Sequence, residues 1–153
     1  MHLCCKVLEC LKGKTLVTAE GCTGGGIGQA LTAVPGSSSV YKGGIICYTN
    51  WVKEQLLKVP GMILKQEGAV SAPVASAMAE GAKDVLQADI AVSVTGLAGP
   101  GGDDFGNPVG TVYIGYSDAA TTVSREYHFS GSRDAVRNQA VLSALELILE
   151  FNS

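Results

Sequence analysis

The segment from Thr15 to Gly26, TLVTAEGCTGGG, most constrains the fold, because it joins β-branched and apolar residues directly to a glycine-rich turn. A helical pattern resumes at Ile27–Leu31. A strand that ends in such a turn and leads into a helix leaves backbone N–H groups unpaired at the helix N-terminus. These groups can bind an anion or stabilise a developing oxyanion. The segment therefore predicts a ligand site at the end of a strand, with no obvious nucleophile in it.

The other predicted elements alternate between helices and strands along most of the chain. Apolar runs at 44–49 and 89–95 indicate strands buried on both faces, and the alternating runs at 109–116 and 122–129 favour an antiparallel pair. Asn50, Ser71 and Ser132 are the expected N-caps. The predicted strands are at 15–19, 44–49, 89–95, 109–116 and 122–129. The predicted helices are at 5–11, 23–33, 50–57, 62–66, 72–86 and 134–151. This order predicts one α/β domain over residues 1–153, with three α/β/α layers, a mixed and mainly parallel sheet, and a short N-terminal helix within residues 1–13.

Composition excludes several classes of protein. Hydrophobic residues make up 46% of the chain and charged residues 16%, which argues against disorder. The net charge of −3 argues against a nucleic-acid partner. No apolar run reaches the roughly 18–20 residues needed to cross a membrane, and no signal peptide is recognisable. The 5 cysteines show no C-x-x-C spacing, which favours reduced thiols and a cytoplasmic protein. His2 and His128 are far apart, so no metal site is expected.

Three glycine-rich or polar segments follow predicted strands, at 19–25, 48–53 and 95–102. Ligands of open α/β sheets gather where the strands end. A single glycine-rich turn is more often a turn or packing device, so the prediction of a pocket depends on all three segments together.

Three basic residues are candidates for chemistry. Lys53 lies one turn into a predicted helix, where the positive helix N-terminus lowers its pKa toward that of a general base. A solvated surface lysine is the alternative. Arg133 and Arg137 share a face of the last helix and are candidates for binding a phosphate or carboxylate. Solvated arginines, or a pair with Asp134, are the alternative.

Several runs resemble the CinA C-terminal domain family, which includes stand-alone nicotinamide mononucleotide amidohydrolases of the PncC type. These runs are TAEGCTGG, VPGSSSVYKGGIICYTNWVK, EGAVSAPVASAMAEGA, VSVTGLAGPGG, NPVGTVYIGY and FSGSRDAVRNQAV, and the resemblance covers about residues 15–151. It implies an α/β/α fold and association into dimers or larger homo-oligomers. It also implies deamidation of a small pyridine nucleotide, nicotinamide mononucleotide, to nicotinate mononucleotide and ammonia in pyridine nucleotide recycling, without a metal or organic cofactor.

The resemblance also implies a Ser/Lys mechanism, in which a lysine takes the proton from a serine that attacks the carboxamide carbon. Lys53 matches the lysine of the family motif Y-S-N-x-x-K, Tyr48 and Asn50 match the residues before it, and Thr49 replaces its serine. Gly21 stands at the nucleophilic serine of the motif A-E-S-C-T-G-G. Because glycine cannot form an acyl-enzyme, we expect the activity to be impaired by several orders of magnitude.

Three possibilities for a chain without the serine remain open at this point. Cys22 or Thr23 would be competent if its side chain faced the pocket. A water molecule activated by Lys53 is the second alternative. The third is a non-catalytic homologue that binds a nucleotide and acts as a sensor or partner domain.

The remaining roles implied by the resemblance concern substrate binding. The backbone of Cys22 to Gly25 is expected to form the oxyanion hole, and Glu20 to orient Lys53, bind a ribose hydroxyl or serve a structural role at the strand end. The candidates for substrate binding are Glu20, Gly24, Gly25, Tyr48, Asn50, Thr95, Gly96, Gly99, Gly101, Arg133 and Arg137, with either Arg133 or Arg137 expected to bind the 5′-phosphate.

Overall fold

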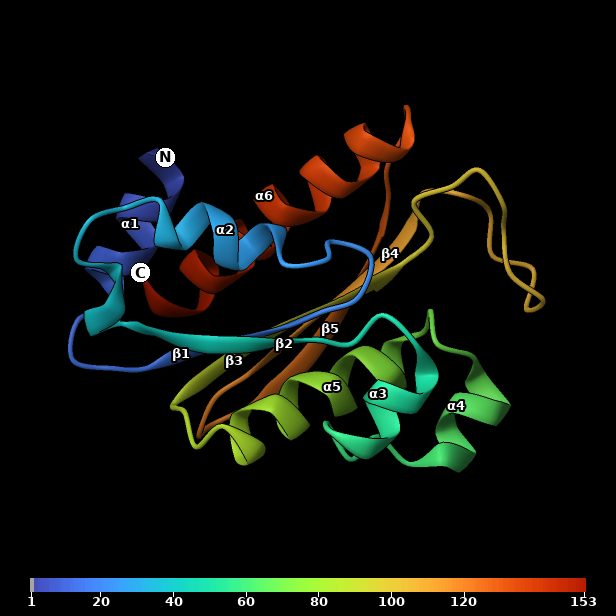
Figure 1. Cartoon of the computed structure of the whole chain (residues 1–153), viewed down its shortest axis with the longest axis horizontal. Helices are drawn as coiled ribbons and strands as arrows, with labels where there is room; N and C mark the ends of the chain where they lie inside the picture. The colour runs from blue at the N-terminus through green and yellow to red at the C-terminus, as the bar shows by residue number, and fades with distance from the viewer. Residues whose placement is uncertain (1) are drawn as a thin grey trace.

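The computed structural model describes residues 2–153 and has a central sheet between two layers of helices (Figure 1). The strands are β1 (Leu16–Glu20), β2 (Tyr41–Ile46), β3 (Ile90–Gly96), β4 (Thr111–Ser117) and β5 (Thr122–His128). One face carries α1 (His2–Cys10), α2 (Gly26–Thr32) and α6 (Arg133–Asn152), and the other carries α3 (Asn50–Gln55), α4 (Gly61–Glu67) and α5 (Ala72–Val85). A 3₁₀ turn, η1 (Ser37–Ser39), precedes β2. The predicted α/β/α layering is confirmed.

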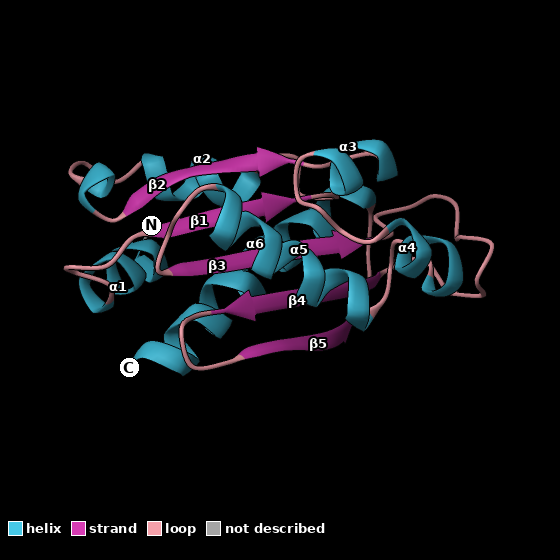
Figure 2. Cartoon of the chain, turned by 90° about the horizontal axis from the view of Figure 1, so that it is seen from below, coloured by secondary structure: helices cyan, strands magenta, loops and turns pink. Residues whose placement is uncertain are grey.

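The 5-stranded sheet has the order β2-β1-β3-β4-β5 (Figure 2). Strand β1 pairs in parallel with both β2 and β3, whereas β4 is antiparallel to β3 and to β5. Glu20 at the end of β1 is in register with Ile46 on β2 and with Val94 on β3. The carboxyl ends of these three strands therefore meet at one edge of the sheet, which brings the three glycine-rich or polar segments together.

Strand β2 differs from its prediction. It spans Tyr41–Ile46 rather than 44–49, pairs only with β1, and alternates between half-buried and exposed residues. Ile46 is 57% exposed. The apolar run was interpreted as a strand buried on both faces, which is wrong, because apolar composition alone does not distinguish an interior strand from an edge strand with an apolar outer face.

The predicted helix caps have different outcomes. Ser132 caps α6, since its hydroxyl accepts a hydrogen bond from the Ala135 N–H at 3.2 Å. The cap predicted at Ser71 is wrong in its chemistry, because the Ser71 hydroxyl donates to the Gly68 carbonyl at 2.8 Å. Asn50 lies inside the first turn of α3, and Thr49 occupies the N-cap position without a side-chain hydrogen bond.

Helix α2 begins at Gly26, three residues later than predicted. The residues before it form a turn in which Gly24 and Gly25 have φ angles of 58° and 102°. This left-handed backbone is unfavourable for residues with a side chain. The turn therefore depends on glycine at both positions, and it separates the end of β1 from the helix.

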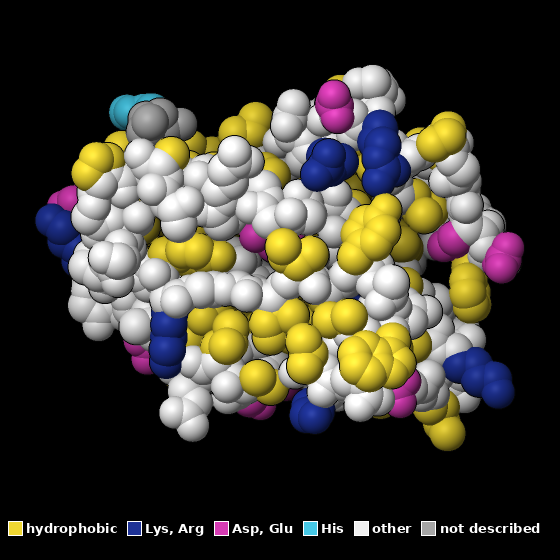
Figure 3. Space-filling view, in the orientation of Figure 1, with side chains coloured by type: hydrophobic (Ala, Val, Ile, Leu, Met, Phe, Trp, Pro, Cys, Tyr) yellow, Lys and Arg dark blue, Asp and Glu magenta, His cyan; other side chains and the backbone are white. Residues whose placement is uncertain are grey.

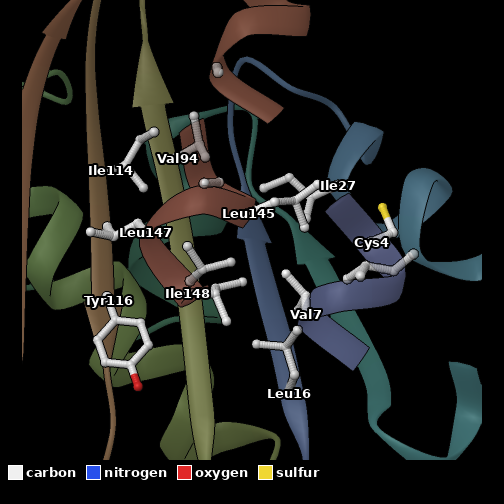
Figure 4. Packing of buried hydrophobic residues seen from close by; sticks show 14 of the residues in the cluster. Cys4, Val7, Leu16, Ile27, Val94, Ile114, Tyr116, Leu145, Leu147 and Ile148 are labelled. Carbon is white, nitrogen blue, oxygen red and sulfur yellow. The ribbon is translucent and has the colours of Figure 1, made fainter. Parts of the chain in front are cut away.

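The larger apolar core lies between the sheet and α1, α2 and α6 (Figure 4). Figure 4 shows Val7, Leu16, Ile27 and Ile148 from four elements pointing into it, and each is fully buried. Cores of this kind contribute most of the favourable free energy of folding. None of the helices within residues 2–153 combines the length and apolar content needed to cross a membrane.

On the opposite face, α5 packs directly against the backbone of the sheet. The Ser93 hydroxyl on β3 donates to the Ala75 carbonyl of α5 at 2.6 Å. A Cβ atom at Gly115 on β4 would lie 2.4 Å from the same carbonyl oxygen, closer than carbon and oxygen can approach. Glycine at this position therefore allows α5 to pack closely against the sheet.

We expect Gly115→Ala to destabilise the protein by about 1–3 kcal/mol, because the added methyl group forces α5 away from the sheet. Urea denaturation measures this change. Gly101→Ala is the matched control, since a Cβ there meets no atom within 4 Å. Equal stability of the two variants would contradict the packing described for α5.

Candidate active site

A cavity of about 300 Å³ opens at the carboxyl ends of β1 and β3, beside the first turns of α3 and α6. Ten of the predicted site residues line it. These are Gly21, Cys22, Tyr48, Asn50, Lys53, Thr95, Gly96, Gly99, Gly101 and Arg133, and the further lining residues are Ala69, Val70, Leu97 and Ala98. The three segments thus form a single pocket, as their positions after predicted strands indicated.

Lys53 is buried in this pocket, with only 3% of its surface exposed. Its ammonium group donates to the Cys47 carbonyl oxygen at 2.8 Å, and it pairs with no carboxylate among residues 2–153. Burial lowers the pKa of Lys53, an effect that the nearby Cys47 and Cys22 thiols partly oppose. The direction agrees with the prediction, but the main cause is desolvation and not the field of the helix. The alternative of a solvated surface lysine is wrong.

Gly21 follows β1 directly, and its N–H donates to the Val94 carbonyl oxygen at 2.9 Å. A Cβ atom at this position would lie 3.8 Å from the Cys47 carbonyl oxygen that accepts the hydrogen bond from Lys53. A side chain at position 21 would therefore stand next to the lysine. The same Cβ would lie only 2.9 Å from the Val94 oxygen, so a side chain here requires a small shift of the backbone.

The two neighbouring candidates for a nucleophile are both poorly suited. Cys22 lines the pocket, but burial raises the pKa of its thiol to about 11, so the reactive thiolate is scarce at neutral pH. Thr23 lies outside the pocket lining, and its hydroxyl donates to the Glu20 carboxylate at 2.8 Å. Neither side chain is therefore arranged to act as a nucleophile in this structure.

Glu20 was predicted to orient Lys53, to bind a ribose hydroxyl or to serve a structural role at the strand end, and its contacts fit the structural role. Its carboxylate is 2% exposed and accepts hydrogen bonds from the Ile27 and Gly28 N–H groups at 2.8 and 3.0 Å. It also accepts from the hydroxyls of Thr18 and Thr23 at 3.1 and 2.8 Å. The start of α2, which the sequence suggested as an anion site, is thus occupied by the protein's own carboxylate, and Glu20 contacts neither Lys53 nor the pocket.

Arg133 and Arg137 do not form the predicted clamp, because they point into different hollows. Arg133 lines the pocket and donates to the Gly99 carbonyl at 2.6 Å and to the Tyr48 hydroxyl at 3.1 Å. Arg137 lies in a neighbouring hollow with Gly24 and Gly25, and its Nε donates to the Cys22 carbonyl at 2.9 Å. Figure 3 shows basic side chains over the N-terminal end of α6. Of these two arginines, Arg133 is the one that can contact a ligand in the pocket.

The pocket wall opposite β1 includes two residues that sequence reasoning missed, Ala69 and Val70. They lie between α4 and α5 and are held there because the Thr95 hydroxyl donates to the Ala69 carbonyl at 2.7 Å. The Asn107 side chain also donates to the Val70 carbonyl, at 3.2 Å. Small apolar residues in a connection carry no chemical signal, so only the fold reveals their place.

A comparison with models of known protein families shows to which family the chain belongs. A family model described as the CinA C-terminal domain matches residues 4–152. The chain belongs to this CinA family. The family predicted from the sequence motifs is confirmed.

Relatives of two lengths are similar to this CinA family chain. CinA-like proteins of Synechococcus sp. (strain RCC307) and Geobacter sulfurreducens are 49% and 48% identical over 139 and 135 residues, and the matches cover 90% and 88% of this chain. The chain spans about a third of their length (33% in each case). The nicotinamide-nucleotide amidohydrolase PncC of Pseudomonas putida is 44% identical over 138 residues, which cover 90% of this chain and 86% of that protein.

Solved structures of CinA proteins share the whole fold. A CinA superfamily protein from Klebsiella pneumoniae has a TM-score of 0.94 at 32% identity, covering 97% of this chain and 94% of that one. The competence/damage inducible protein CihA from Agrobacterium tumefaciens has a TM-score of 0.95 at 36% identity, covering 99% of this chain and 94% of that one. The backbone around the pocket is therefore that of the CinA family.

We expect Lys53→Met to be more stable than the parent CinA chain at pH 7, because it removes a buried charge without a counter-ion. A gain of about 1 kcal/mol raises the Tm by about 2–4 °C for a chain of this length. The unfolded chain binds the lysine proton more tightly than the folded one, so the parent gains stability as the pH rises from the lowered pKa toward the ordinary value of 10.5.

Differential scanning calorimetry from pH 7 to pH 10 measures this difference, which shrinks as the pH rises. Lys65→Met, at an exposed position on α4, is the matched control. A lower Tm for Lys53→Met than for the parent at pH 7 would contradict an energetic cost of burying this charge.

Proposed function

We propose that this chain binds nicotinamide mononucleotide or a related pyridine nucleotide in the Lys53 pocket and hydrolyses its amide far more slowly than family members that carry the serine. The observation that carries this proposal is a buried lysine beside Gly21 in a pocket of the CinA fold. The 44% identity to PncC of Pseudomonas putida supports the choice of substrate.

Slow hydrolysis without the serine requires a water molecule as the nucleophile. In its neutral form, Lys53 accepts a proton from water, and the water oxygen attacks the carboxamide carbon. The C–N bond then breaks, and the proton leaves with the nitrogen as ammonia. Cys22 is the residue of the Cys22 to Gly25 turn that lines the pocket, and the Gly24 N–H already donates to the Gly21 carbonyl at 3.1 Å, so we assign the Cys22 N–H as the donor to the oxyanion.

Arg133 is the group that we assign to the 5′-phosphate. A guanidinium has five N–H donors, and the hydrogen bonds to Gly99 and Tyr48 use two of them. The remaining donors are available to a phosphate without loss of either contact. The backbone of Thr95, Gly96, Gly99 and Gly101 lines the same pocket and is assigned to the ribose and phosphate.

The second candidate function is a non-catalytic nucleotide-binding protein that acts as a sensor or partner domain. Gly21 favours it, because this position has no side chain and its backbone is hydrogen-bonded to β3. In that case the pocket binds its ligand and releases no ammonia.

Both functions are tested by comparing the parent chain with Gly21→Ser for binding of nicotinamide mononucleotide and for ammonia release. We expect both proteins to bind the nucleotide, and the parent to release ammonia at least about 100-fold more slowly than Gly21→Ser, because a positioned nucleophile is restored. Lys53→Ala in the Gly21→Ser background should abolish the gain.

Three results are decisive in this experiment. Rapid ammonia release by the parent would contradict the missing nucleophile. Undetectable release by the parent, with release by Gly21→Ser, would favour the non-catalytic function. A failure of both proteins to bind the nucleotide would overturn the proposed substrate.

We also propose that the chain forms a homo-oligomer through an apolar patch that extends from the end of β2 to the residue after α3. The patch consists of Ile46, Tyr48, Trp51 and Leu56, which are 57%, 62%, 68% and 47% exposed. Figure 3 shows hydrophobic side chains gathered over this region. Strand β2 is also an edge strand, whose outer backbone groups can pair with a second copy.

Light scattering should therefore report a dimer or a larger assembly at micromolar concentration. Trp51→Lys together with Ile46→Lys should shift it to a monomer, because two charges enter an apolar contact. The matched control is Leu142→Lys, at an exposed position on α6. A monomeric parent chain would contradict the proposal.

A further inference from the structure

The charge of the pocket is one-sided. Lys53 and Arg133 are the only charged residues among those that line it, and both are positive. A pocket of this kind favours a ligand that brings negative charge close to each cation. Arg133 is already assigned to a phosphate, which leaves the charge of Lys53 without a partner.

Within residues 2–153, the ammonium group of Lys53 has one hydrogen-bond acceptor, although it has three N–H groups to donate. An ammonium group has three N–H donors, and the Cys47 carbonyl accepts one of them. Gly21, which faces the same carbonyl, has no side chain to accept another. A buried cation is costly unless it is paired with opposite charge or fully hydrogen-bonded. The position beside Gly21 therefore calls for a ligand atom that accepts hydrogen bonds.

Four carbonyl oxygens close to Lys53, Gly21 and Arg133 already accept hydrogen bonds. The oxygens of Cys47, Val94 and Gly99 accept from Lys53, from the Gly21 N–H and from Arg133. The Ala69 oxygen accepts from the Thr95 hydroxyl. A carboxamide carries an NH₂ group that needs acceptors, whereas a carboxylate offers only acceptors. At the position beside Lys53 and Gly21, a group that only accepts hydrogen bonds is therefore a better match than an NH₂ group.

We propose that this pocket selects the carboxylate form of a pyridine nucleotide over its amide, with the Lys53 ammonium binding the carboxylate beside the missing side chain at Gly21. This inference rests on the proposed function and deepens it, because it specifies the chemical form of the ligand. A carboxylate supplies the counter-charge that Lys53 lacks, and a charge-assisted hydrogen bond is about twice as strong as a neutral one. The chain is then a binder of the reaction product of its relatives' chemistry.

Isothermal titration calorimetry of the intact protein with nicotinate mononucleotide and with nicotinamide mononucleotide tests this selection at pH 7. We expect the acid to bind at least about 10-fold more tightly than the amide. Lys53→Met should weaken acid binding at least about 10-fold and change amide binding by less than about 3-fold. Gly21→Ser should reduce the ratio of the affinity for the acid to the affinity for the amide, because the serine hydroxyl then accepts a hydrogen bond from Lys53.

Three controls separate this inference from other causes. Lys65→Met should bind both nucleotides as the parent does. Inorganic phosphate, used as a competitor for the Arg133 end of the pocket, should lower the affinities for both nucleotides by the same factor. Circular dichroism and retained binding of the amide show that Lys53→Met is folded.

The outcomes distinguish this inference from the proposed function. Equal affinity for the two nucleotides, or tighter binding of the amide, would overturn the selection of the acid and leave the nucleotide pocket standing. An acid preference that persists in Lys53→Met would exclude Lys53 as its cause. If neither nucleotide binds, the proposed function fails as well.

Discussion

The carboxylate of Glu20 is the interaction on which the site depends. It lies at the end of β1 and accepts hydrogen bonds from two N–H groups at the start of α2, so it holds the strand and the helix together across the glycine turn. Arg137 holds the same turn from the other side through the Cys22 carbonyl. With both ends of the turn fixed, Gly21 and Cys22 face the pocket in a defined backbone geometry. Loss of either contact would free the wall that stands beside Lys53.

The site also contains a cost that the rest of the fold offsets. Lys53 is a buried cation that pairs with no carboxylate in the described part of the chain, and the other residues of the short helix α3 are largely exposed. A position of this kind is retained when its chemistry is useful, since an apolar side chain would be more stable there. The larger apolar core, a second one that includes Val17 of β1 and Val74 and Met78 of α5, and the direct contact between α5 and the sheet supply the stability that offsets this cost.

The sequence predicted the order of elements, the edge of the sheet where the pocket forms and the lysine within it. These follow from periodicity, strand ends and the family motifs. It did not distinguish Glu20 as a structural carboxylate, because its partners Ile27 and Gly28 are backbone donors that leave no mark in a side-chain pattern. The roles of Arg133 and Arg137 also separated only in the structure, since a shared helix face does not say which hollow each side chain enters. The edge position of β2 depends on the pairing of strands, which composition does not encode.

Tyr48 belongs to the pocket lining and to the apolar patch, and its hydroxyl accepts a hydrogen bond from Arg133. A ligand phosphate at Arg133 and a protein surface over the patch would therefore act on the same side chain. Coupling between the two binding events would be reciprocal: the factor by which the ligand changes assembly would equal the factor by which assembly changes the affinity for the ligand. If the proposed nucleotide and the proposed assembly both use Tyr48, the state of association of this small domain would report on the occupancy of its pocket.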